Sequence, residues 1–146
     1  MKVKLRIDSQ VTEDSVSIEA RLMTESIQEL VHFAQYLGKE DKIHVKKEDE
    51  IYLLDAKEIH RLYTENRQVR VRTAKDSYRA QQALYQLLQV LPEHFLQISQ
   101  SEIINSRQIS HLKLTPNGLI QIFLKNGDMT YSSRRYLKSI KERLQL

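Results

Sequence analysis

The 146-residue chain contains no cysteine and no tryptophan, and it has only three glycines and two prolines. Without cysteine it has no disulfide framework and no thiolate metal site, which indicates a reducing compartment. No apolar run approaches the roughly 18–20 residues that a membrane-spanning helix needs. Residues 1–7 alternate basic and apolar side chains, whereas a signal peptide has a continuous apolar stretch. The sequence therefore predicts a cytoplasmic protein of about one domain's length.

Enzyme motifs are also lacking. The sequence has no G-x-S-x-G, no H-E-x-x-H and no glycine-rich phosphate loop. Its histidines are isolated, so a surface or hydrogen-bonded core role is favoured for each over a ligand or catalytic role. These five are His32, His44, His60, His94 and His111. We expect no enzymatic activity, no bound metal and no cofactor.

Charge is unevenly distributed along the chain. The net charge of +4 combines −4 over residues 1–66 with +8 over residues 67–146. A chain that is basic in one half favours an extended anionic partner, of which nucleic acid is the commonest and an anionic membrane surface is the other candidate.

Residue periodicity predicts a mostly β, α+β protein with three helices. Alternation predicts strands at 2–7 and 16–20, and a Ser26–Glu29 capping box with helical spacing predicts a helix at 25–37. Asp76 and Pro92 bound a second predicted helix at 76–90, and a basic helix is expected at 133–144. The other predicted strands are 42–46, 50–55, 58–64, 67–73, 94–98, 108–114, 119–125 and 128–132.

The basic residues at the start of the last predicted helix suggest a binding site. Arg134 and Arg135 lie where the helix dipole disfavours cations, so dipole complementarity does not explain them. Free N–H groups at such a junction suit a phosphate, and arginine can donate two parallel hydrogen bonds to guanine. A second basic cluster extends from Arg67 to Arg79.

Three stretches in order resemble the LytTR family of bacterial DNA-binding domains. They are H-F-L-Q-I-S-Q-S-E-I-I-N at 94–105, L-K-N-G-D at 124–128 and Y-S-S-R-R-Y-L-K-S-I-K at 131–141. The resemblance covers residues 44–146 and leaves residues 1–43 as a strand and helix extension that could face a partner. It implies an elongated arrangement of small β-sheets with a C-terminal helix, whose loops read successive major grooves and bend the DNA.

The resemblance also implies which residues contact DNA. His60, Gln100 and Arg135 fall at the base-reading positions, and their chemistry suits a purine acceptor, adenine and guanine respectively. Phosphate contacts are then expected from Lys57, Arg61, Ser101, Ser133, Arg134 and Lys138. Gln97 and Gln100 replace cations that the family usually carries, which should lower the affinity and its salt dependence.

Partners follow from the same resemblance. Residues 1–43 are too few for a receiver domain, so the likeness is to stand-alone LytTR transcriptional regulators, which are often paired with a small membrane-protein inhibitor. Double-stranded DNA with tandem repeat sites and a homodimer on DNA are expected. The alternative is a peripheral membrane-docking or adaptor protein without sequence-specific DNA binding, which would use the basic C-terminal helix.

Overall fold

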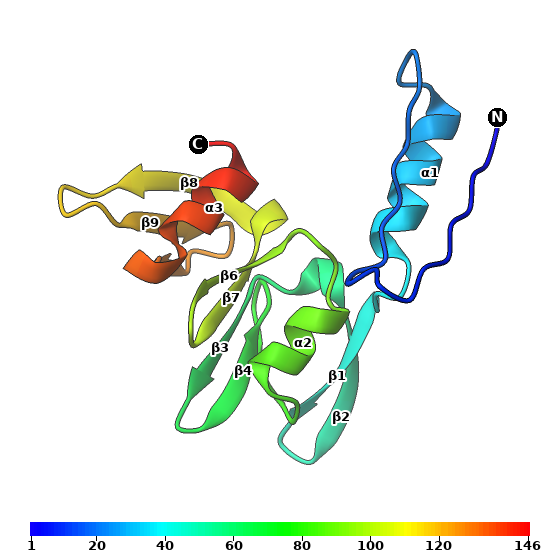
Figure 1. The fold of residues 1–146 in the computed structure, drawn as a ribbon. Helices are drawn as coiled ribbons and strands as arrows, with labels where there is room; N and C mark the ends of the chain where they lie inside the picture. The colour runs from blue at the N-terminus through cyan, green and yellow to red at the C-terminus, as the bar shows by residue number, and fades with distance from the viewer. The chain divides into compact units, whose positions relative to one another are not determined.

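The computed structural model describes the backbone of residues 1–146 and every side chain except that of Tyr36. The chain forms two compact units, an N-terminal unit of residues 1–37 and a C-terminal unit of residues 38–146. The mostly β fold with short helices is confirmed (Figure 1).

The N-terminal unit contains one helix, α1 (Glu25–Tyr36). Thr24 caps it, because its Oγ1 accepts a hydrogen bond from the Ile27 N–H at 3.3 Å, so the cap lies two residues before the predicted Ser26. The strands predicted at 2–7 and 16–20 are wrong: no residue from 1 to 24 is in a strand. Val3, Leu5 and Ile7 are more than 80% exposed, so the alternating pattern has nothing to pack against within this unit.

The C-terminal unit contains a seven-stranded antiparallel sheet in the order β2-β1-β5-β4-β3-β7-β6. Short helical segments connect some strands. The elements are β1 (Lys42–Lys47), β2 (Glu50–Asp55), η1 (Ala56–Glu58), β3 (Arg61–Glu65), β4 (Gln68–Arg72), β5 (Ser77–Ala80), α2 (Leu84–Val90), β6 (Phe95–Ser99) and β7 (Glu102–Asn105).

A second sheet of three strands follows in the order β10-β9-β8. Its elements and the C-terminal segment are η2 (Ser106–Gln108), β8 (Ile109–Leu114), β9 (Ile120–Leu124), β10 (Met129–Tyr131), η3 (Arg134–Tyr136) and α3 (Leu137–Leu144). The helix predicted at 133–144 is thus a 3₁₀ turn followed by an α-helix.

The helix predicted at 76–90 is wrong in its first half. Residues 77–80 form β5, which pairs with β4 so that Tyr78 lies opposite Val71. The preceding turn holds Asp76 by its backbone, because the Asp76 N–H donates to Thr73 Oγ1 at 3.1 Å. Tyr78 and Ala80 are two residues apart and lie on the same face of β5, as strand periodicity requires. The helical periodicity begins only at Leu84.

Two hydrophobic cores hold the C-terminal unit together. The first lies between the large sheet and α2 and includes Leu62, Val71 and Leu87, which are inaccessible to solvent. The second joins β6, β7 and the small sheet to α3 through residues such as Ile98, Ile122 and Ile140. The second core anchors the segments that follow β6 and β10, and these segments carry two of the predicted base readers.

Candidate nucleic-acid interface

The tight turn between β6 and β7 presents Gln100 to solvent. A bulge between Gln97 and Ser99 leads into it, and the Ser101 N–H donates to Ser99 Oγ at 3.3 Å. The Thr64 N–H donates to the Ser101 carbonyl at 2.9 Å, which fastens the turn to the end of β3. The Gln100 and Ser101 side chains are both exposed, so the amide can reach a ligand from a fixed backbone.

The segment after β10 lies beside this turn. The Ser133 N–H donates to the Ile98 carbonyl at 2.9 Å. Ile98 comes two residues before Gln100, and Ser133 comes two residues before Arg135. The hydroxyl of Ser132 accepts a hydrogen bond from the Ile120 N–H at 3.0 Å, which anchors the segment to β9 as well. The structure therefore brings Gln100 and Arg135 onto neighbouring, backbone-fixed segments.

The cations of this segment have no acidic partner among the described side chains. Arg134, Arg135 and Lys138 are exposed, and none forms an ion pair there. Ser133 differs from these residues, because its Oγ is buried and has no hydrogen-bond partner among the described residues. Three cations with free charge, on the segment that lies beside the Gln100 turn, create a local positive surface suited to an anion.

His60 lies at the opposite end of β3 from the Gln100 turn. Its N–H donates to the Arg72 carbonyl at 2.8 Å, and its carbonyl accepts from the Asn105 N–H at 3.0 Å. Thr64 lies four residues further along the strand, or about 13 Å away. His60 is 5% exposed, and burial lowers the pKa of its ring. The structure thus does not bring His60 to Gln100 and Arg135.

Lys57 is at the same end as His60, in η1. Its side chain is exposed, with Nζ 3.8 Å from Asp55 Oδ2, and its carbonyl accepts from Gln108 Nε2 at 3.1 Å. Four of the six predicted phosphate contacts therefore divide between two ends of the sheet, with Lys57 at one and Ser101, Arg134 and Lys138 at the other.

Arg61 is engaged inside the protein. Its Nε lies 2.9 Å from Glu102 Oε2, its Nη1 lies 3.8 Å from Asp128 Oδ2, and its guanidinium stacks 4.2 Å above the Tyr63 ring. The other Glu102 oxygen accepts from Thr130 Oγ1 at 2.8 Å. This arrangement ties β3 and β7 to β10, which leads directly to Ser133 and Arg135.

Arg72 completes this ion-pair network. It donates two hydrogen bonds of 3.0 Å to Asp128, and these bonds lower the pKa of that carboxyl. Burial raises the pKa of Glu102, and the nearby Arg61 charge opposes that rise. The sequence did not identify this network, although Asp128 ends the L-K-N-G-D stretch at 124–128. These residues position the candidate site through β10.

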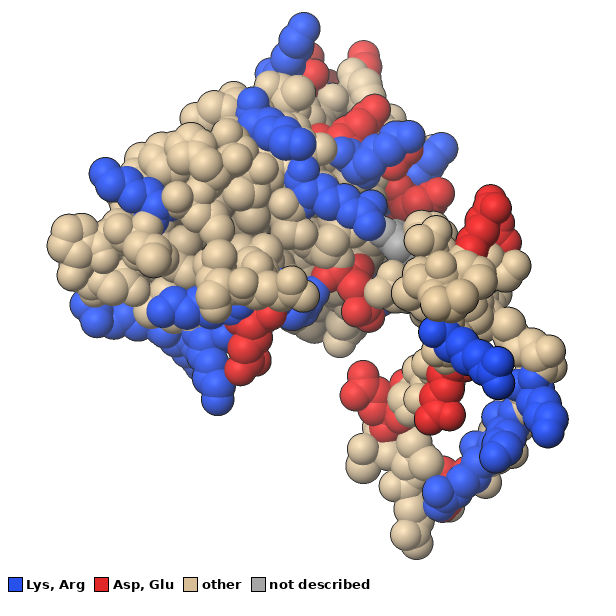
Figure 2. Space-filling model, turned by 90° about the horizontal axis from the view of Figure 1, so that it is seen from above, with Lys and Arg blue, Asp and Glu red and all other residues tan. Residues whose placement is uncertain are grey.

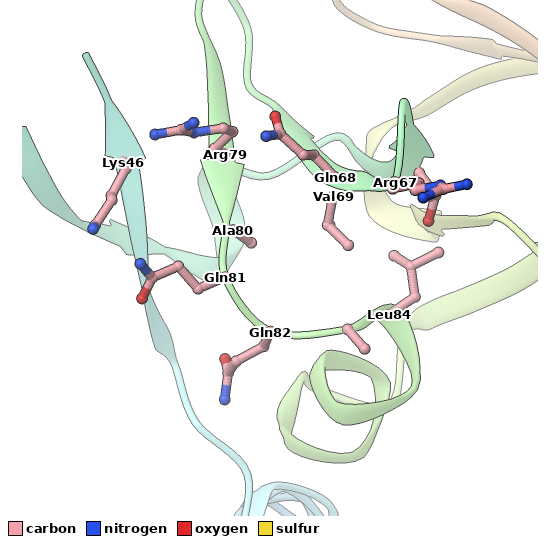
Figure 3. Close-up of a pocket in the computed structure, with 11 residues that line it drawn as sticks. Lys46, Arg67, Gln68, Val69, Arg79, Ala80, Gln81, Gln82 and Leu84 are labelled. Atoms are coloured by element: carbon pink, nitrogen blue, oxygen red, sulfur yellow. The ribbon is translucent and has the colours of Figure 1, made fainter. Parts of the chain in front are cut away.

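A second basic surface lies where β1, β5 and the β3–β4 turn meet (Figure 3). Arg79 is directly opposite Lys46 on one side and Arg70 on the other, an arrangement of like charges that costs stability. Lys46, Arg67 and Arg79 line a cavity of about 570 Å³ together with Gln68, Gln81 and Gln82, without any carboxylate in the lining. Part of the predicted Arg67–Arg79 cluster is thus gathered at one place, whereas Arg72 is directed to Asp128.

Comparison with known proteins identifies the family. The family model described as the LytTr DNA-binding domain matches residues 49–145. The chain belongs to the LytTr DNA-binding domain family. The described residues contain no helix that is long and apolar enough to cross a membrane.

Relatives of this LytTr protein match along its whole length. Two proteins of Staphylococcus aureus, from strains NCTC 8325 and COL, are 38% identical over 146 residues, which is 100% of this chain and 99% of each relative. Both are described as HTH-type transcriptional regulators. A solved structure, the LytTr DNA-binding domain of a methyl-accepting/DNA response regulator from Bacillus cereus, superimposes with a TM-score of 0.70 at 16% identity. The match covers 73% of this chain and 99% of that one, and it supports the fold.

Proposed function

We propose that this protein is a transcriptional regulator that binds double-stranded DNA at specific sequences. The match to the LytTr DNA-binding domain and the description of full-length relatives as transcriptional regulators support this function. The observation that carries it is the Ser133–Ile98 hydrogen bond, which fixes Gln100 and Arg135 on neighbouring exposed segments. A cationic hydrogen-bond donor beside an amide is the side-chain chemistry that reads base edges in the major groove.

In this proposal, base reading and phosphate binding are separate tasks. Arg135 donates to guanine and Gln100 pairs with adenine, while Ser101, Arg134 and Lys138 bind phosphates beside them. Lys57 contacts the backbone at the His60 end, and His60 contacts a base there once its ring turns outward from its buried position. Ser133 contributes through its segment's backbone. We assign Arg61 to positioning, because reaching a phosphate would separate it from Glu102.

The proposal extends to how the regulator is used. Because the proposed contacts lie at two ends of one sheet, the protein can contact more than one groove of the duplex. Bending of the DNA would let both ends of the sheet contact it at once. Two copies then occupy tandem repeat sites. Control by a small membrane protein that sequesters the regulator, in place of phosphorylation, follows from the resemblance to stand-alone members of the family.

Selection of binding sites from random double-stranded DNA tests the function, followed by salt titration of the selected site. We expect log Kd to rise with log salt concentration, because phosphate contacts release counterions. Arg135→Ala should weaken binding by about 1–3 kcal/mol and relax the preference at one base position. Lys113→Ala on β8, an exposed cation on the far strand of the small sheet, is the matched control. A selection that yields no enriched sequence, or a salt slope near zero, would refute the proposal.

The membrane-docking alternative is less well supported. It needs a helix with a free apolar face, but Ile140 of α3 is buried in the second core, where Tyr136, Leu137 and Leu144 also pack. The basic side chains of α3 therefore lack an apolar surface that could insert into lipid. Flotation with anionic liposomes in the absence of DNA distinguishes the two functions, and we expect the protein to stay unbound.

A further inference from the structure

The N-terminal unit exposes far more apolar surface than the rest of the chain. Among the described side chains, ten of the 18 exposed large hydrophobic ones lie in residues 1–37, whereas Ile27 alone of the 22 buried hydrophobic ones lies there. The unit makes up about a quarter of the sequence. An exposed apolar concentration of this kind marks an interaction surface.

These side chains follow the pattern of two half-buried strands. Val3, Leu5 and Ile7 share one face of residues 2–7, and Val16, Ile18 and Ala20 share one face of residues 14–20. Among the described residues, neither segment makes a backbone–backbone hydrogen bond. Both segments therefore have an apolar face, and their backbone N–H and C=O groups are available for hydrogen bonds to a neighbouring β-strand.

The polar faces of the two segments have opposite charges. Lys2, Lys4 and Arg6 alternate with the apolar residues of the first, whereas Ser15, Ser17 and Glu19 alternate with those of the second, so its only charge on that face is negative. Figure 2 shows Lys and Arg side chains along one side of the N-terminal unit and Asp and Glu side chains along another. An antiparallel pairing that keeps the apolar residues on one face places a cation opposite Glu19, which favours this register.

Helix α1 could cover one face of such a sheet, because part of its apolar surface is exposed. Ile27 is buried and Val31 half-buried, but Phe33 and Leu37, on the flank of the same apolar stripe, are 64% and 65% exposed. A shallow cavity of about 210 Å³ lies against Ile27 and Val31 and is lined mainly by apolar residues of 18–23. The helix thus buries only part of its stripe within one copy.

We propose that residues 1–37 form a homodimer in which residues 2–7 and 14–20 become strands paired with a second copy, covered by the two α1 helices. Units below about 40 residues need disulfides, metals or association to be stable, and this one has no cysteine and a single histidine. An isolated hairpin is marginal, whereas two copies supply enough strands for one stable sheet. A protein interface of standard size uses about 20–30 residues per partner, which this unit can provide.

This inference goes beyond the proposed function and does not depend on it, because the dimer forms without DNA. Sedimentation of the full chain at about 10 μM, free of DNA, should give twice the 17.3 kDa chain mass. Hydrogen exchange should show protected amides in 2–7 and 14–20. A wild-type monomer at 100 μM would overturn the proposal, and so would protection of these amides in a monomer, which would indicate a hairpin within one chain.

Substitution at the apolar face gives the sharpest test. Leu5→Glu should raise the dimer dissociation constant at least about 100-fold, because two-fold symmetry introduces the charge twice. Leu5 is 83% exposed within one copy, so the variant should keep the fold of the C-terminal unit, as judged by tyrosine near-ultraviolet circular dichroism. Leu114→Glu, at a residue of β8 that is 68% exposed, is the matched control and should leave the dimer intact.

Charge reversal tests the pairing itself. Lys4→Glu and Glu19→Lys should each weaken the dimer about 2–5-fold, and the double variant should recover most of the loss. Equal weakening without recovery would overturn the proposed register.

If Leu5→Glu dimerises as well as the wild type, or if the wild type instead binds anionic vesicles through this unit, the second copy is not the occupant. Leu5→Glu should still bind a single DNA half-site, and Arg135→Ala should still dimerise, so failure of one proposal is distinguishable from failure of the other.

Discussion

Residues 2–7 and 68–72 have nearly the same pattern but different structures. The first reads K-V-K-L-R-I and the second Q-V-R-V-R, so both alternate apolar with polar or basic residues. Residues 68–72 form β4 between β5 and β3, where Val69 and Val71 are buried, whereas residues 2–7 form no strand and leave Val3, Leu5 and Ile7 exposed. An alternating pattern thus specifies a strand only where neighbouring strands and a core are present.

The largest expected effect comes from removing a buried side chain of the C-terminal unit. Leu62→Ala in β3 should lower the free energy of unfolding by about 2–5 kcal/mol, since it leaves a cavity in the first core. Leu5→Ala should leave the unfolding of this unit unchanged. Urea titration followed by tyrosine circular dichroism measures the difference, because six of the seven tyrosines lie in residues 38–146. Equal losses in the two variants would contradict the comparison.

A slightly smaller loss is expected from the ion-pair network of the same unit. Arg61→Ala removes the cation that faces the buried Glu102, and we expect a loss of about 2–3 kcal/mol, less than for a fully buried pair because Arg61 is 18% exposed. Adding Glu102→Gln should recover part of that stability, since no charge is then left unpaired. Arg107→Ala, at an exposed arginine, is the control for loss of a cation. The urea midpoint of each variant provides the test.

Acid should destabilise the C-terminal unit through His94. Burial, followed by the charge of Arg107, lowers the pKa of His94 to about 4, while an unfolded histidine titrates near 6.5. The unfolded chain therefore binds the extra proton first, and this contribution to stability is lost as the pH falls from 6.5 to 4. His94→Gln should flatten the dependence of unfolding free energy on pH in that window, with His111→Gln as the control. An unchanged slope would show that His94 does not titrate in this way.

The smallest effect concerns the N-terminal unit. Thr24→Ala removes the α1 cap and should cost about 1 kcal/mol of local helix stability, without altering the C-terminal unit. Hydrogen exchange of the α1 amides measures this loss. Ser26→Ala is the matched control, because the sequence favours Ser26 as the cap while the structure uses Thr24. A larger loss from Ser26→Ala would reverse that assignment.

Much of the C-terminal unit was predictable from local signals. The strands predicted at 108–114, 119–125 and 128–132 correspond to β8, β9 and β10, and Gly118 and Gly127 adopt the positive φ that tight turns between such strands require. Residues 77–80 were not predictable in this way, because Ala80 fits both a helical stripe and a strand face. Pairing with β4 decided between them.

The candidate site was predictable in composition but not in arrangement. The sequence placed Gln100 in a turn and Arg135 at the start of a helix, and the structure adds the Ser133–Ile98 hydrogen bond that makes their segments neighbours. It could not show that Arg61 faces Glu102 or that His60 is buried. Both facts depend on segments that are distant in the chain, since β3 pairs with β7 and Asp128 comes from the turn between β9 and β10.

The sequence alone determined that this protein lacks cysteine, and it determined the family resemblance and the basic character of residues 67–146. Tertiary structure decided which of two similar alternating segments becomes a strand and which cations keep their charge free for a ligand. The physical reason is the same in both cases. Burial and ion pairing depend on side chains brought together from distant positions in the chain. Periodicity describes only which faces of one segment are apolar or polar.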